Sequence, residues 1–195
     1  LGRHDLLVRR KKKYAKTTDS FHRYRIHDNL IKELAVDRVH QVWVSDITYI
    51  RLIGGFCYLA LVTDLYSRKI VGYDLSLSLS LDGALRALQM ALKTHSPEGL
   101  IHHSDRGVQY CADDYIALLQ KNGAKISMGE AGNPYDNAVA ERLNGILKDE
   151  FFLDATFVDF AQALKAVKEA IDTYNNLRPH MSLNYRTPAE VCMAA

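Results

Sequence analysis

The sequence predicts an α/β fold in which a mixed β-sheet is covered by helices. Three β-rich runs come first, at residues 42–51, 56–63 and 70–75, and their short connections favour an antiparallel meander. After Ser80 the apolar residues change to helical spacing, and two short strands then alternate with helices. This order of elements is typical of a sheet with helices packed on its faces.

Each later element has a local signal. Leucines at helical spacing follow Ser80, Asn122-Gly123 is a helix C-cap signal, and Thr187-Pro188 favours a helix start. Residues 129–134 contain two glycines and a proline, which predicts a mobile loop. The remaining expected helices cover residues 113–121, 137–151 and 157–174, and the remaining short strands cover residues 100–102 and 125–128.

Composition indicates a globular protein. With 195 residues, 48% of them apolar and 25% charged, the chain is long enough for one domain with a buried core. No apolar run reaches the roughly 20 residues that span a bilayer, and the opening Leu-Gly-Arg contains no apolar leader. Cys57, Cys111 and Cys192 are odd in number and widely spaced, which favours free thiols. We therefore expect no membrane partner and a cytoplasmic chain that is the remainder of a longer protein.

Positive charge is concentrated at the start of the chain. Residues 1–40 hold 11 of the 25 Lys and Arg residues but only 5 of the 23 Asp and Glu residues. The densest run is Arg9, Arg10, Lys11, Lys12 and Lys13. Basic residues interleaved with aromatics can follow a phosphate backbone and stack on bases. We expect residues 1–40 to be a basic DNA-binding arm and residues 41–195 to be the body. For the basic run alone, a solvated tail is an equally good interpretation.

Three carboxylates stand in distinctive settings. Asp46 lies inside an apolar strand, where a carboxylate is costly to bury unless it is paired or binds a metal. Asp105 directly follows a second apolar run, and ligand sites gather at the carboxyl ends of strands in open α/β sheets. A solvent-facing Asp46 and an Asp105 that caps the next helix are the alternatives.

Glu141 is the third carboxylate, and it lies on an expected helix. It shares a helical face with Asn144, Gly145 and Lys148, and Asn137 lies one turn earlier. Such a face can be presented to DNA, and an ordinary solvated charged face is the alternative. Acids that flank two Mg²⁺ ions about 3.5–4 Å apart can support cleavage or transfer of phosphodiesters. His102 and His103 have no matching zinc-ligand partners, so we expect them to be strand-end residues around the site.

Over residues 41–191 the chain resembles the catalytic half of bacterial insertion-sequence transposases. This is the group whose transposase is joined from two overlapping reading frames and whose core is similar to retroviral integrases. The motifs that carry the resemblance, in order, are VWVSDITYI, YLALVTDLYSRKIVGYDL, LIHHSDRGVQYC, GNPYDNAVAERLNGILKDEF and YNNLRPHMSLNYRTPAEV.

The resemblance implies a ribonuclease-H-like fold and a DDE active site. The expected sheet has five strands, three antiparallel and then two parallel, is flanked by helices, and has its first and fourth strands adjacent. Asp46, Asp105 and Glu141 would then be the catalytic metal ligands for two Mg²⁺ ions, with Mn²⁺ as a substitute. The implied reaction is cleavage of one strand at the element end, followed by attack of the freed 3′-hydroxyl on another phosphodiester.

The resemblance also implies partners. The expected contacts to the end DNA are Tyr135, Asn137, Arg142, Asn144 and Lys148. A homo-oligomer, at least a dimer on DNA, is expected because two element ends must meet, and the place of action would be the bacterial nucleoid. Arg178 and His180 match a family motif whose role the sequence does not define, and a structured turn is the simplest interpretation.

Two departures from the family pattern and two rival functions remain. Gly129-Glu130 replaces the usual basic pair, which weakens the expected DNA contact of that loop. The upstream helix-turn-helix segment is missing, so recognition of specific ends should be reduced. The rivals are a ribonuclease-H-like nuclease and an inactive remnant that acts as a DNA-binding or oligomerisation module.

Overall fold

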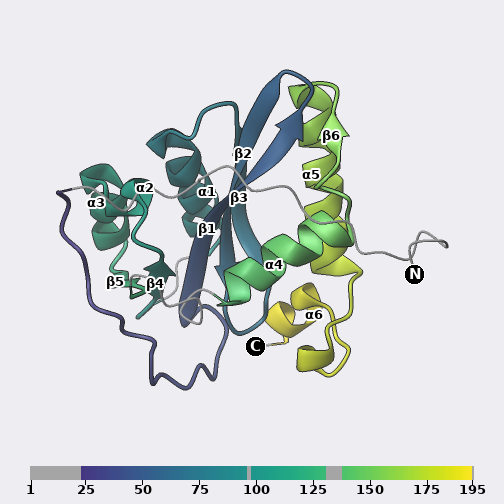
Figure 1. The fold of residues 1–195 in the computed structure, drawn as a ribbon. Coiled ribbons are helices and arrows are strands. Elements are labelled where there is room, and N and C mark those ends of the chain that lie inside the picture. The colour runs from purple at the N-terminus through teal and green to yellow at the C-terminus, as the bar shows by residue number, and fades with distance from the viewer. Residues whose placement is uncertain (1–22, 96–97, 131–137, 195) are drawn as a thin grey trace, which may run out of the picture.

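A computed structural model describes residues 23–95, 98–130 and 138–194. It contains one six-stranded sheet with helices on both faces (Figure 1). The strands are β1 Val42–Leu52, β2 Gly55–Asp64, β3 Ile70–Ser76, β4 Ile101–Ser104, β5 Lys125–Met128 and β6 Thr156–Phe157. The helices are α1 Leu81–Thr94, α2 Val108–Cys111, α3 Asp113–Lys121, α4 Ala138–Asp149, α5 Phe160–Asn176 and α6 Pro188–Met193, with a 3₁₀ turn at Met181–Leu183.

The sheet has the predicted mixed topology. Its main path runs β3-β2-β1-β4-β5, with the first three strands antiparallel and β4 and β5 parallel to β1. The first and fourth strands are adjacent, as expected. The short β6 was not predicted, and it pairs with β1 at Arg51 and Leu52. Because β4 pairs only with residues 42–45, residues 46–50 of β1 lie between the stretches that pair with β4 and with β6.

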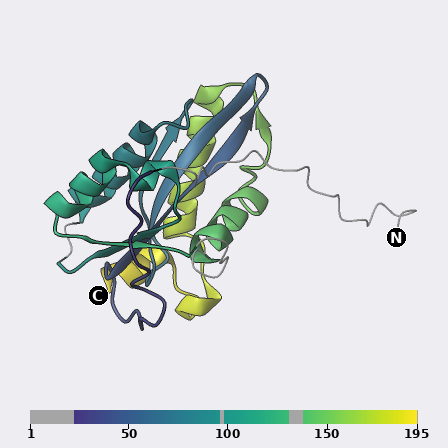
Figure 2. The same ribbon diagram turned by 60° about the vertical axis from the view of Figure 1, so that its left-hand side comes forward.

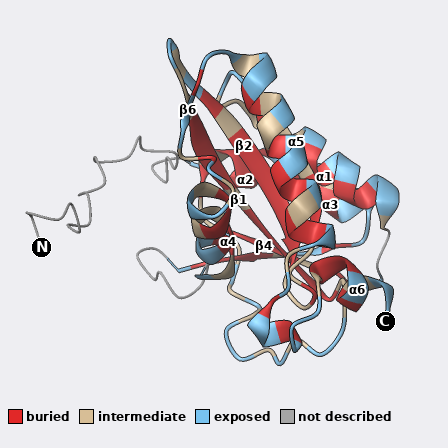
Figure 3. Cartoon of the chain, turned by 90° about the vertical axis from the view of Figure 1, so that its right-hand side faces the viewer, coloured by how far each residue is buried: buried red, intermediate tan, exposed pale blue. Residues whose placement is uncertain are grey.

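Side chains of β1 point alternately to the two faces of the sheet and pack into two separate hydrophobic cores. Trp43 and Ile47 face the core shared with α1 and α3, whereas Ile50 faces the core shared with α4 and α5. Figure 2 shows these two groups of helices on opposite sides of the strands. In Figure 3 the buried residues run along the sheet and the inner faces of the helices, which is the pattern of a three-layer α/β domain.

Local signals set the helix boundaries. Asp159 caps α5 by accepting a hydrogen bond from the backbone N–H of Gln162 at 2.8 Å. Thr187 and Glu190 form a capping box at the start of α6. Gly123 follows α3 with φ of 70°, as the predicted C-cap requires. The helix expected from residue 157 begins instead at Phe160, because residue 157 belongs to β6.

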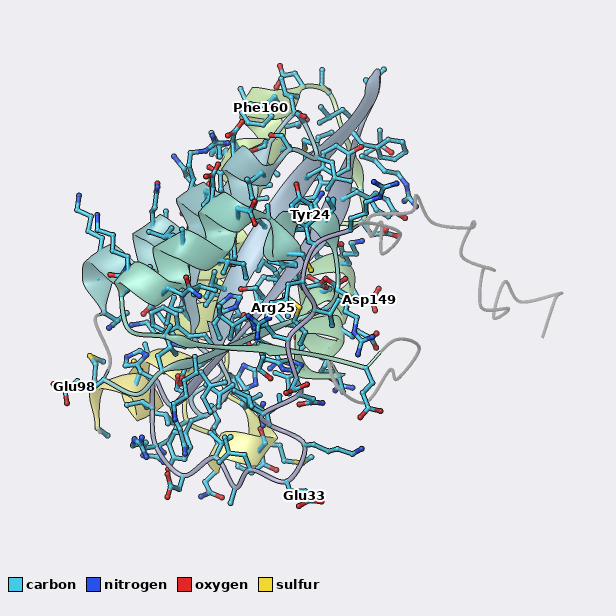
Figure 4. The ribbon with its side chains drawn as sticks, turned by 90° about the vertical axis from the view of Figure 1, so that its left-hand side faces the viewer. Tyr24, Arg25, Glu33, Glu98, Asp149 and Phe160 are labelled. Atoms are coloured by element: carbon cyan, nitrogen blue, oxygen red, sulfur yellow. The ribbon has the colours of Figure 1, made fainter. Side chains whose placement is uncertain are left out.

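The end of the predicted arm packs on the body. Residues 23–40 contain no helix or strand and loop past β5 before entering β1 (Figure 1). The backbone N–H of Leu30 donates to the Ser127 hydroxyl at 2.8 Å, and the backbone N–H of Met128 donates to the carbonyl of Asp28 at 3.3 Å. Figure 4 places Tyr24 and Arg25 on the first part of this segment and Glu33 on its lower loop. The earlier part of the arm, with Arg9 to Lys13, lies outside the described residues.

Two further expectations concern thiols and membranes. Cys57, Cys111 and Cys192 are all free, and the first two are buried. Within the described ranges, no helix combines the length and the apolar character needed to cross a membrane.

Candidate active site

Asp46 and Asp105 come from neighbouring parallel strands. The register pairs Ser45 of β1 with Ser104 of β4, and each aspartate is the next residue along its strand. Both carboxylates are half-buried. The sheet therefore places them at the same level, at the carboxyl end of β4 and beside the stretch of β1 that has no neighbour on that side.

The carboxyl group of Asp46 is strongly perturbed. Burial raises its pKa, the neighbouring charge of Asp105 raises it further, and Glu141 adds a smaller repulsion. Hydrogen bonds from the backbone of Ile47 and the side chain of Asn144 act in the opposite direction. The result is a pKa of about 7, so a large fraction of Asp46 is protonated at neutral pH when no cation is near.

Asp105 is positioned by its own turn. Its Oδ1 accepts a hydrogen bond from the backbone N–H of Gly107 at 2.9 Å, just where α2 begins. The next side chain, Arg106, donates from Nε to the carbonyl of Gly129 at 2.8 Å. The turn after β4 is thus joined to the end of β5, and these two contacts fix the position of the Asp105 backbone.

Helix α4 brings the third acid to the site. Asn144 Nδ2 donates to Asp46 Oδ2 at 2.5 Å, which fixes the helix against β1. Glu141, one turn earlier on the same face, is exposed and lies near enough to raise the pKa of Asp46. In the parts of the chain that the structure describes, no three His, Cys, Asp or Glu side chains are grouped to hold a metal ion.

The other predicted contact residues have mixed positions. Arg142 is exposed on α4, while Asn144 is engaged with Asp46. The Lys148 ammonium lies 4.2 Å from the centre of the Tyr49 ring, a cation–π contact beside the site. A methyl group added at Gly145 would meet nothing within 4 Å, so this face of α4 is open to a close approach. Tyr135 and Asn137 lie outside the described residues.

His102 and His103, at the end of β4, are hydrogen-bonded to hydroxyl groups. His102 Nε2 lies 2.8 Å from the Ser45 hydroxyl and 3.0 Å from the Tyr115 hydroxyl. His103 Nδ1 lies 2.8 Å from the Ser127 hydroxyl. Burial lowers the pKa of His102 to about 3, so its ring is neutral and acts as a packed, hydrogen-bonded part of the layer beneath the carboxylates.

Sequence reasoning missed the contacts of the C-terminal turn. Arg178 forms a bidentate ion pair with Glu150, with nitrogen–oxygen distances of 2.6 and 2.7 Å, and its Nη1 lies 3.2 Å from His180 Nε2. Glu150 directly follows α4. The motif whose role was undefined therefore fastens the far end of the helix that carries Glu141, and no pattern in the sequence pairs residues 150 and 178.

The fold and this edge of the sheet define a class, the ribonuclease-H-like catalytic cores of the retroviral integrase type. The structure is similar to a chain of a simian T-cell lymphotropic virus intasome in complex with the PP2A regulatory subunit B56 gamma. The TM-score is 0.67 at 18% identity, over 93% of this chain and 60% of that one. It is also similar to the HTLV-2 integrase catalytic core domain in complex with magnesium, with a TM-score of 0.62 at 17% identity, over 79% of this chain and 97% of that one.

Sequence comparisons identify the family. Two models described as integrase core domain match residues 36–134 and 122–188. The chain is 39% identical over 187 residues to the insertion element IS600 uncharacterized 31 kDa protein of Shigella sonnei, covering 94% of this chain and 69% of that protein. It is 40% identical over 166 residues to the transposase for insertion sequence element IS904 of Lactococcus lactis, covering 83% of this chain and 65% of that protein. The chain belongs to the integrase core domain family of insertion-sequence transposases, as predicted.

Proposed function

We propose that this chain is the catalytic core of a DNA transposase, in which Asp46, Asp105 and Glu141 hold divalent cations and direct phosphodiester cleavage and strand transfer. The observation that carries the proposal is the placement of two carboxylates side by side on neighbouring parallel strands, with the helix of the third acid hydrogen-bonded to the first. The chain spans 69%, 60% and 65% of three insertion-element relatives, so the activity of the whole protein is part of the proposal.

The donor set fits a hard divalent cation. Carboxylate oxygens are the ligands that Mg²⁺ and Mn²⁺ prefer, and the HTLV-2 integrase core domain is described in complex with magnesium. The raised pKa of Asp46 supports the same assignment, because a buried carboxyl group next to a second carboxylate resists ionisation until a cation compensates it. Two ions held there would activate an attacking oxygen and stabilise the leaving one.

The protein's own residues prepare this chemistry. Asn144 fixes one oxygen of Asp46, so the other oxygen keeps a defined direction. The hydrogen bond from Gly107 does the same for Asp105. Glu141 is exposed on α4, one turn before the asparagine that is hydrogen-bonded to Asp46. The open space beside Gly145 lets a DNA backbone approach this face closely.

The partners follow from the same proposal. Transposon ends and target DNA are the substrates, with Tyr135, Asn137, Arg142 and Lys148 near the end DNA and the run Arg9 to Lys13 along phosphates. Joining two ends requires at least two copies of the chain, and the HTLV-2 core domain is described in dimeric and trimeric forms. The place of action would be chromosomal DNA in the bacterial cytoplasm.

The test is cleavage and joining of a branched DNA oligonucleotide in Mg²⁺ or Mn²⁺, because such a substrate demands little end recognition. Asp46→Asn, Asp105→Asn and Glu141→Gln should each lower the rate by about 100-fold or more, since each removes a ligand that acts in the transition state. DNA affinity in metal-free buffer should stay within about twofold. Asp114→Asn is the matched control, because Asp114 is exposed on α3 and should tolerate the change.

The outcomes separate the rival functions. Cleavage retained in any triad variant would move the active site elsewhere. Cleavage without joining in the parent chain would favour a ribonuclease-H-like nuclease. DNA binding with neither reaction, by a folded parent chain, would favour an inactive DNA-binding module. Loss of both reactions in the variants alone, with Asp114→Asn active, is the result we expect.

A further inference from the structure

A second concave site lies behind α4, on the side away from the carboxylates. It is a cavity of about 600 Å³, lined by α4, the end of α5 and the turn around Met181–Leu183. Leu143 and Ile146 form part of its apolar wall. Figure 1 shows α4 above α6 and the C-terminal turns. Asp46, Asp105 and Glu141 are not among the residues that line it, so this cavity is distinct from the candidate active site.

Arg68 gives the cavity an unusual donor. The side chain is half-buried, and its Nη1 is sealed from solvent without a hydrogen-bond partner among the described residues. Burial lowers the pKa of this guanidinium, although it stays charged at neutral pH. The carboxylate of Asp64 accepts hydrogen bonds from His40 and Ser67 instead. A buried cationic donor without a partner is costly unless a ligand completes it.

The backbone holds Arg68 in this position. Its φ is 65°, in the left-handed region that non-glycine residues rarely adopt. Its N–H donates to the carbonyl of Asp64 at 2.9 Å, and its own carbonyl accepts from the Tyr174 hydroxyl at 3.1 Å. These contacts fix the main chain of Arg68 in the turn between β2 and β3, at the rim of the cavity that its side chain lines.

The charged side chains that line the cavity are arginines, and the carboxylate of Glu150 lies behind one of them. Arg68, Arg142 and Arg178 line the cavity, and no carboxylate does so among the described residues. Arg178 is already paired with Glu150, which leaves the exposed Arg142 and the part of the half-buried Arg68 side chain that lines the cavity to face an anion. Tyr185 is 73% exposed at the lining, where an aromatic face is open to stacking.

We propose that this cavity binds a backbone phosphate of the DNA substrate, with Arg68 and Arg142 as its donors and Tyr185 stacking on the adjacent base. Guanidinium groups match phosphate geometry, and the apolar wall with an exposed tyrosine suits a base better than it suits a free anion. The inference rests on the proposed function, because DNA is the polyanion that α4 would meet. The inference gives the far side of α4 a role in positioning the substrate. The three acids, as proposed metal ligands, do not provide such a contact.

The test compares Arg68→Met with the parent chain, using a branched DNA oligonucleotide and a series of copies that each contain one neutral methylphosphonate. Neutralising the contacted phosphate should weaken binding by the parent roughly tenfold, and it should weaken binding by Arg68→Met clearly less, because only Arg142 then contacts that phosphate. The slope of log K against log salt should fall by about 0.9 in the variant, the value of one phosphate contact. Arg68→Lys should keep the slope and lose part of the affinity, since it keeps the charge but not the fork.

Controls separate binding from folding. Lys165→Met also removes one positive charge, from a side chain that is 80% exposed on α5, and should leave the salt slope unchanged. Arg68→Met should unfold at the same or a higher temperature than the parent, because it removes a half-buried charge that has an unpaired donor. A lower unfolding temperature would instead mark a structural arginine and overturn the proposal.

The remaining outcomes are also decisive. If the parent binds and cleaves DNA and Arg68→Met matches it at every methylphosphonate position, this inference is wrong and the proposed function stands. A change in oligomeric state on sedimentation, with DNA binding unaltered, would assign the cavity to a carboxylate of a second copy and overturn the phosphate assignment. If the parent binds no DNA, both proposals fail together.

Discussion

Asp46 shows how much of a residue's chemistry is set by contacts far away in the chain. Its apolar surroundings on β1 were predictable, because they are the neighbouring letters of the sequence. Its hydrogen bond to Asn144 joins residues 98 positions apart, and its repulsion with Asp105 depends on the register of β1 and β4. The sequence therefore predicted a costly carboxylate, while the extent and causes of its pKa shift required the fold.

The pKa of Asp46 predicts a pH-dependent stability. The pKa is raised to about 7 in the folded protein, above its ordinary value in the unfolded chain, so the ionised form destabilises the fold. Stability from this group is therefore greatest at acidic pH and is lost as pH rises toward about 7, by roughly 2 to 4 kcal/mol. Asp46→Asn should remove this loss in metal-free thermal unfolding.

The comparison has to be made as a difference between variant and parent. Burial lowers the pKa of His95 and His180 to about 4, so these groups stabilise the fold as pH rises through the acidic range, which is the opposite sign. The same histidines are present in both proteins and cancel in the difference. Equal pH profiles for Asp46→Asn and the parent would show that the Asp46 carboxyl is not perturbed. Added Mg²⁺ should stabilise the parent more at pH 8 than at pH 6.

The partners of Arg68 and Arg178 could not be predicted from the sequence. Both stand in motifs that the family resemblance covers, yet the motif gives no partner for either. Arg178 finds Glu150 only because α4 and α5 end side by side. Arg68 is distinctive because its donor finds no partner among the described residues, and such a property exists only in a folded molecule.

At the scale of elements, the sequence predicted what is local. The five main strands and the helices α1, α3, α4, α5 and α6 have clear periodicity or caps, and they are present. The two-residue β6 and the four-residue α2 were missed. Thr156 and Phe157 form a strand only because Arg51 and Leu52 offer an edge about one hundred residues earlier in the chain. Short elements of this kind have too little pattern to detect.

Replacing either of two glycines with alanine should change the stability of the fold, in opposite directions. A methyl group at Gly72 of β3 would lie 2.1 Å from the carbonyl oxygen of Ala87 in α1, so Gly72→Ala must force the sheet and helix apart. We expect a loss of about 3 kcal/mol or more, or failure to fold. Gly145→Ala, inside α4 with nothing within 4 Å, should instead stabilise by about 0.5–1 kcal/mol. Denaturant unfolding of both variants measures the two effects, and a stable Gly72→Ala protein would contradict the described contact.

At the scale of the whole molecule, charge is divided between the start of the chain and the body. The described part of the start, residues 23–40, is anchored on the body by the hydrogen bonds of Leu30 and Asp28 to residues of β5. This placement joins the proposed basic arm to the β4–β5 end of the sheet, which is the end that carries Asp105.

The basic arm has its own test. Replacing Arg9, Arg10, Lys11, Lys12 and Lys13 with Gln should weaken DNA binding and lower the slope of log K against log salt by up to about 4. Cleavage of DNA that is already bound at saturating concentration should change little, because these side chains are proposed to contact phosphates and not the reacting atoms. Titrations at several salt concentrations provide the measurement. An unchanged slope would show that the arm makes no phosphate contacts.

The ion pair between Arg178 and Glu150 holds the C-terminal end of α4, whereas Glu141 lies in the first turn of that helix. Glu150 lies nine residues beyond Glu141, about 14 Å along a helix that rises 1.5 Å per residue. A tilt of about 5° at this ion pair therefore moves the third acid by about 1 Å, a displacement that can cost a hundredfold in rate. A residue beyond the end of α5 would thereby control where the proposed third metal ligand lies.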